Sequence, residues 1–126
     1  MKRIALTLTL SILVLGFAGA ALASGDHDHG DGAFMVQGEV LDMACYVSHG
    51  AKGPDHAACA KRCAKGGQPI GLLADDGAVY LLFASHDDGS AYEATKELAG
   101  TKVMISGKKF EKDGITGVEV HEVKAL

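Results

Sequence analysis

The stretch CYVSHGAKGPDHAACAKRCAKGG, residues 45–67, contains all three cysteines of the 126-residue chain and two of its six histidines. The pair Pro54-Asp55 is typical of a helix start, with Asp55 as the capping residue, and the pair Gly66-Gly67 is typical of a helix end. This stretch therefore predicts a helix that carries most of the chemically distinctive side chains of the chain.

The predicted helix brings one imidazole and two thiols to a single face. His56, Cys59 and Cys63 stand at positions i, i+3 and i+7, and residues at that spacing lie above one another on a helix. Cys45 precedes this helix at the end of a strand-like run, from which it can reach the same face. Three sulfurs and one imidazole are therefore expected to converge.

The rest of the chain predicts a mainly β scaffold with two helices. Residues 90–99 show a helical pattern, which lies between the third and fourth of five strand-like runs. This element order is that of an OB-fold, a five-stranded barrel, with the cysteine-bearing helix inserted between strands 1 and 2. A five-stranded sheet with two helices on one face is the alternative. The strand-like runs are 34–43, 69–73, 79–83, 102–107 and 115–123.

The N-terminus has the layout of a secretory signal peptide. Lys2 and Arg3 form a basic head, and residues 4–23 are an apolar run that ends in an A-x-A pattern. Because a run of about 20 apolar residues can also span a bilayer, an uncleaved membrane anchor is the alternative. The many small residues near position 20 favour cleavage. We expect residues 1–23 to be removed, which leaves a periplasmic or secreted protein with no membrane segment.

Residues 24–32, SGDHDHGDG, contain no apolar side chain and predict a flexible linker. Its two histidines, His27 and His29, either collect divalent ions loosely or belong to a solvated acidic tail. Residues 33–126 are enough for one small OB-like domain and too few for two.

The charge of the chain argues against nucleic acid as a partner. The formal net charge of −4 becomes −6 when Lys2 and Arg3 leave with residues 1–23, and an acidic domain repels phosphates. Tryptophan is absent, so a stacking surface for bases is not expected either. An envelope protein is a more plausible partner than a nucleic acid, and the sequence leaves the oligomeric state open.

The cysteine cluster predicts a metal site made by Cys45, Cys59 and Cys63, with His56 as the fourth ligand. Thiolates are soft donors that select Cu(I) or Zn(II), and three sulfurs with one imidazole suit a closed tetrahedral zinc site. Three thiolates, or two with the imidazole, equally suit Cu(I) in a carrier that releases its ion. The sequence predicts copper or zinc as the cofactor.

Several neighbouring residues are secondary candidates. Basic residues at positions 61, 62 and 65 of the same helix are expected to lower the thiol pKa values. Asp42 is expected to hydrogen-bond a ligand histidine or to cap local backbone. Met43 is either a core residue or a thioether donor, and His49 is either an outer ligand or solvated.

The alternative to a metal site is a disulfide from Cys45 to Cys59 or to Cys63, with the third thiol left unpaired. Such a bridge closes a loop of about 15 to 20 residues and contributes roughly 3 kcal/mol to stability. The protein would then be a disulfide-stapled interaction module that binds an envelope protein through its barrel.

Catalysis is not supported by the sequence, which contains no Gly-x-Ser-x-Gly, no phosphate-binding loop and no His-Glu-x-x-His. A cysteine nucleophile partnered by His56 is disfavoured, because i, i+3 residues on one helix point outward in parallel. We expect a binding protein and not an enzyme.

The chain contains a set of short motifs: Asp42-x-x-Cys45, His56-x-x-Cys59-Ala60-x-x-Cys63, Gly67-x-Pro69, Val79-Tyr80 and Leu98-Ala99-Gly100-x-x-Val103-x-Ile105-x-Gly107. Together they resemble those of a group of small exported bacterial proteins that have no assigned activity. The resemblance covers about the whole expected domain, and its specificity depends on the three spaced cysteines. It implies an exported OB-like domain and supplies no mechanism.

Overall fold

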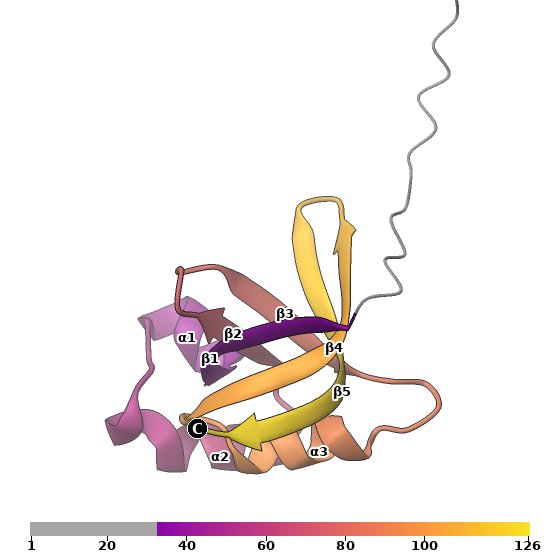
Figure 1. The fold of residues 1–126 in the computed structure, drawn as a ribbon. Helices are drawn as coiled ribbons and strands as arrows, with labels where there is room; N and C mark the ends of the chain where they lie inside the picture. The colour runs from indigo at the N-terminus through magenta and orange to yellow at the C-terminus, as the bar shows by residue number, and fades with distance from the viewer. Residues whose placement is uncertain (1–32) are drawn as a thin grey trace, which may run out of the picture.

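Five strands close into a barrel within residues 33–126, the part of the chain that the computed structural model describes (Figure 1). The expected signal peptide and linker, residues 1–23 and 24–32, lie outside the described residues. None of the helices in the described range is long and apolar enough to cross a membrane. The elements in chain order are β1 (Phe34–Asp42), α1 (Met43–His49), the 3-10 helix η1 (Pro54–His56), α2 (Ala57–Lys65), β2 (Ile70–Ala74), β3 (Val79–Ala84), α3 (Ser90–Glu97), β4 (Lys102–Lys112) and β5 (Ile115–Ala125).

The strand order confirms the OB-like barrel predicted from the sequence. Around the barrel the strands run β1-β2-β3-β5-β4, and β4 pairs with β1 to close it. Strands β3 and β5 are parallel, and the other neighbours are antiparallel. Helix α3 lies between β3 and β4 in the chain, and α1 and α2 lie between β1 and β2, as expected for an OB-fold with an insertion.

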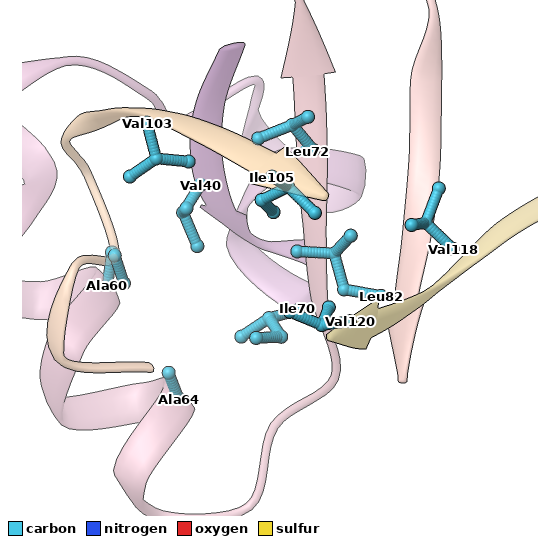
Figure 2. Close-up of a cluster of buried hydrophobic side chains, with 11 residues drawn as sticks. Val40, Ala60, Ala64, Ile70, Leu72, Leu82, Val103, Ile105, Val118 and Val120 are labelled. Atoms are coloured by element: carbon cyan, nitrogen blue, oxygen red, sulfur yellow. The ribbon is translucent and has the colours of Figure 1, made fainter. Parts of the chain in front are cut away.

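The core is built from the inward faces of all five strands and from one face of α2. The alternation predicted for β1 is observed up to Val40, which is fully buried while Met35 and Gln37 are exposed, but at the end of the strand both faces are buried. Burial of each such aliphatic side chain contributes about 1.5–3 kcal/mol. Figure 2 shows the cluster, whose buried members are Val40, Ala60, Ala64, Ile70, Leu72, Leu82, Ala99, Val103, Ile105, Val118 and Val120.

The insertion between β1 and β2 contains a helix that the sequence did not predict. Strand β1 ends at Asp42, and α1 begins at once because Asp42 Oδ1 accepts a hydrogen bond from the Ala44 N–H at 3.0 Å. The helix ends at Gly50, whose φ of 67° is the left-handed conformation typical of a helix end. Cys45 therefore lies on a helix and not at the end of a strand.

The cysteine helix starts close to the predicted place, but as a 3-10 turn and without the predicted cap. Residues Pro54 to His56 form the 3-10 turn η1, and the α-helical conformation begins at Ala57. No side chain caps either segment, and Asp55 is exposed, so the predicted Asp55 cap does not form. The predicted end is confirmed, because Gly66 follows the last residue of α2.

Helix α2 is held against the barrel by small residues. Ala60 and Ala64 are buried in the core cluster, and α2 also contacts β1 and α3. The backbone of Gly100 lies close to both β1 and the N-terminus of α2. Its N–H donates to Val40 O at 2.7 Å, and a Cβ on Gly100 would overlap Ala57. Gly100 thus fixes the distance between the start of α2 and β1.

The two ends of the insertion meet at one point. Asp42 of β1 is paired with Ile70 of β2, and the Met43 N–H donates to Pro69 O at 3.0 Å. A further bond from the Gly53 N–H to the Glu39 carboxylate ties the middle of the insertion to β1. Residues 43–69 are therefore a closed segment on the barrel, and α1 and α2 are brought to the same place.

The close approach at Gly100 predicts a large effect of a single methyl group. Gly100→Ala is expected to lower the free energy of unfolding by about 1–2 kcal/mol for its positive φ and by about 1–3 kcal/mol more for the overlap with Ala57. Gly77→Ala is the matched control, because Gly77 also has a positive φ but its Cβ would meet nothing within 4 Å. Urea unfolding measures both variants, and equal losses would contradict the packing role of Gly100.

Candidate metal centre

Three thiols from two helices meet at one point of the insertion. Cys45 lies on α1, Cys59 and Cys63 lie on α2, and their three Sγ atoms are all within 4.8 Å of one another. All three cysteines are free and half-buried. The convergence predicted from the spacing in the sequence is therefore present, and the sulfurs are separate.

The local structure of each helix explains why the thiols meet. On α2, Cys59 and Cys63 are one turn apart and share a face, while the neighbouring face carries Ala60 and Ala64 into the core. On α1, the capping bond to Asp42 fixes the first turn and hence the direction of Cys45. Since both helices start or end at the paired strands β1 and β2, their cysteine faces are held together.

His56 stands at the junction of η1 and α2, directly before the first residue of α2. One of its ring nitrogens lies within 4.8 Å of a carboxylate oxygen of Asp42 and of Cys45 Sγ. Its Nε2 atom is buried and has no hydrogen-bond partner within the described part of the chain. A buried ring nitrogen without a partner is costly, and binding to an ion would remove that cost.

Asp42 belongs to the site, although the sequence predicted only a supporting role for this residue. Its side chain is 1% exposed, and its second oxygen, Oδ2, is buried without a partner of regular hydrogen-bond geometry among the described residues. Asp42 combines with Cys45 and His56 in a second group of possible metal ligands. A buried carboxylate oxygen that lacks a partner indicates that a cation belongs beside it.

The carboxylate and the thiols perturb one another's ionisation. Burial alone raises the pKa of Asp42, but attraction from the Cys45 and Cys63 thiols and from the Ala44 and Cys45 backbone N–H groups outweighs it and lowers the pKa. Hydrogen bonding to Asp42, followed by loss of solvation, raises the pKa of Cys45 to about 12. The same carboxylate raises the pKa of Cys63. Without an ion, the site therefore favours protonated Cys45 and Cys63.

The expectation that basic residues of α2 lower the thiol pKa values is wrong for Cys45 and Cys63. Arg62 reaches only Cys59, at 3.7 Å from Nη2 to Sγ, and Lys65 pairs with Glu97 of α3 at 2.8 Å. The charge that faces the other two thiols comes from β1 and is negative. A cation, and not the protein itself, is what would favour their thiolate forms.

The remaining candidates lie apart from the thiols or pack elsewhere. His49 is exposed at the last turn of α1. Met43 lies against β2, where its sulfur and Cγ fill the space beside Gly71, which agrees with a packing role. The tail histidines, His27 and His29, lie outside the described residues.

One signal in the sequence points to Asp42. In β1 it alternates with Gly38 and Val40, which places a carboxylate on the face that the barrel buries. Buried acids are rare unless paired or bound to a metal. The alternation could therefore have identified Asp42 as a candidate ligand.

The geometry of the donors is compatible with a metal ion. Zinc lies about 2.3 Å from thiolate sulfur, so two sulfurs on one tetrahedral ion are about 3.8 Å apart. Sulfurs that are already within 4.8 Å of one another reach that separation by small side-chain rotations. Cys45, Cys59, Cys63 and His56 thus lie close enough to hold a metal ion, and Asp42 adjoins them.

Comparison with protein-family models, with curated proteins and with solved structures found no match for the chain. The resemblance to small exported OB-like proteins noted from the sequence stays a prediction. What the site does is therefore inferred from its own side chains.

The raised pKa of Cys45 predicts slow alkylation of its thiol in the metal-free, reduced protein. Asp42→Asn removes the negative charge that disfavours the Cys45 thiolate but keeps a side chain that can cap α1. The pKa of Cys45 should fall, and its rate of reaction with iodoacetamide near pH 9 should rise, as followed by peptide mass spectrometry. Glu122→Gln, an exposed site on β5, is the control for net charge. An unchanged rate in the Asp42 variant would contradict the assigned cause.

Proposed function

We propose that the protein is an exported metal-binding protein that holds Cu(I) or Zn(II) through Cys45, Cys59 and Cys63, with His56 as a further ligand. The observation that carries the proposal is the meeting of three free sulfurs from two separate helices within 4.8 Å. Cysteines are few in this chain, and all of them are at this one place.

The donor set supports a soft or borderline ion. Thiolate sulfur selects Cu(I) and Zn(II), whereas oxygen-binding cations such as Mg²⁺ and Ca²⁺ require carboxylates and carbonyls. The buried, unpartnered Nε2 of His56 supports its recruitment as a nitrogen ligand. The half-exposed cysteines allow an ion to enter and leave without unfolding of the barrel, which suits a carrier or buffer.

The identity of the ion depends on how many donors bind it. Cu(I) is satisfied by two or three thiolates, whereas Zn(II) prefers four ligands in a tetrahedron. The three thiols alone would serve Cu(I), and the addition of His56 would complete a zinc site. Both ions belong to the proposal, and the binding experiment below separates them.

The cellular location is part of the proposal. The basic head and apolar run of residues 1–23 support export to the periplasm or beyond. In an oxidising compartment an odd number of cysteines is a liability, because one thiol stays reactive after a disulfide forms. An ion bound to all three thiolates removes that liability.

The second candidate function is a disulfide-stapled module that binds an envelope protein and carries no metal. Sulfurs within 4.8 Å can also approach to bonding distance, which favours this candidate to the same extent. A disulfide would still leave the buried Asp42 Oδ2 and His56 Nε2 without partners. The metal site gives His56 Nε2 a partner and places a cation next to the Asp42 carboxylate, and for that reason we favour it.

We propose binding without catalysis. A surface hollow of about 580 Å³ adjoins the insertion near Gly53 and Pro54, but its lining includes no cysteine or histidine. The thiols are therefore outside that hollow, and no cysteine nucleophile faces it.

The proposal predicts a specific thiol and metal content. Freshly purified protein, assayed under denaturing conditions with elemental analysis, should give three thiols and at least one equivalent of copper or zinc. Cys63→Ser should weaken binding of Cu(I) or Zn(II) by roughly 100-fold or more in competition with a chromophoric chelator, because it removes a ligand. His49→Gln is the matched control and should leave the affinity unchanged. One free thiol and no metal would instead support the stapled module.

A further inference from the structure

The possible ligands form two groups that share one residue. Cys45, Cys59 and Cys63 make the first group, and Asp42, Cys45 and His56 make the second. The donor atoms of each group lie within 4.8 Å of one another, and Cys45 Sγ is common to both. Four other donors, from β1, η1 and α2, therefore surround Cys45.

One tetrahedral ion does not use all five donors. An ion bound by the three thiols has one place left, which either His56 or Asp42 takes. The other then stays buried beside the site with an unpartnered atom, Nε2 in one case and Oδ2 in the other. Because a buried polar atom without a partner is costly, a single ion leaves the site incompletely satisfied.

The negative charges of the donors also indicate that a single ion does not satisfy the site. Three thiolates and one carboxylate carry four negative charges in a small volume. One divalent ion neutralises two of these charges, and two divalent ions neutralise all four. Arg62 contacts Cys59 from an exposed position, where its charge is screened by solvent.

We infer that the site holds two ions side by side, with the Cys45 thiolate shared between them. This inference rests on the proposed function, since the first position is the thiol site described above. The second position is made by Asp42, Cys45 and His56. A thiolate sulfur has several lone pairs and can bind two ions at once, and two-metal sites in proteins hold their ions about 3.5–4 Å apart.

The second position suits zinc and not Cu(I). One carboxylate oxygen, one imidazole nitrogen and one thiolate are the three ligand types of zinc sites, and a carboxylate is a poor ligand for Cu(I). With three protein ligands, a tetrahedral zinc at this position keeps one open place for water or for a donor from another molecule. The first position, rich in sulfur, accepts either ion.

Titration of the purified full-length protein with zinc and with cobalt tests the inference. Reduced, metal-free protein should bind two equivalents of Zn²⁺, measured by elemental analysis after gel filtration. With Co²⁺, the thiolate charge-transfer absorption should appear with the first equivalent. The electron paramagnetic resonance signal should then weaken as the second Co²⁺ enters, because a shared thiolate couples the two ions.

In the paired arrangement Asp42 and His56 bind the second ion, so two variants remove that position and keep all three thiolates of the first. Asp42→Asn and His56→Gln should each lower the zinc content from two equivalents to one and keep the charge-transfer absorption of the first ion. The matched controls are Asp55→Asn and His49→Gln, exposed residues of the same types in the same insertion, which should both keep two equivalents. Agreement of two independent variants guards against a folding defect in either one.

Each result has a distinct meaning. No bound metal in the unmodified protein would overturn the proposed function itself. One equivalent in the unmodified protein and in both variants would overturn the paired site and leave the proposed function standing. A fall to one equivalent in the double variant His27→Gln/His29→Gln would place the second ion on the N-terminal tail and would also overturn the inference.

Discussion

The pairing of Asp42 with Ile70 is the constraint on which the site depends. It joins the end of β1 to the start of β2, and the bond from the Met43 N–H to Pro69 O extends this closure by one residue. The two ends of a 27-residue segment, residues 43–69, therefore lie side by side at the edge where β1 pairs with β2. Cysteines that are 14 and 18 positions from Cys45 in sequence become its neighbours.

Asp42 has three roles at this junction, and they are in conflict without a cation. It is the last residue of β1, it caps α1, and its carboxylate raises the pKa values of two thiols. The first two roles stabilise the fold. The third disfavours the thiolate forms that a metal needs, so binding of a soft ion must displace protons from this site.

Much of the fold and part of the site could be predicted from the sequence, because they depend on local periodicity. The alternating patterns predicted the strands of the barrel, and the helical spacing predicted that Cys59 and Cys63 share one face. Helix α1 was missed because the alternating pattern of β1 continues into Met43, past the residue that caps the helix. The effect of Asp42 on the thiol pKa values was missed because it depends on α2 packing against β1 through Ala60 and Gly100, which no local pattern encodes.

The two faces of α2 separate the stability of the barrel from the occupancy of the site. Ala60 and Ala64 anchor the helix in the apolar interior, and Cys59 and Cys63 project from the adjoining side. Nothing in the interior packing requires the cysteine side to be filled, in contrast to zinc fingers, which are unfolded without metal. Under the proposed function, the barrel can therefore fold before an ion binds, and release of the ion would leave the barrel folded.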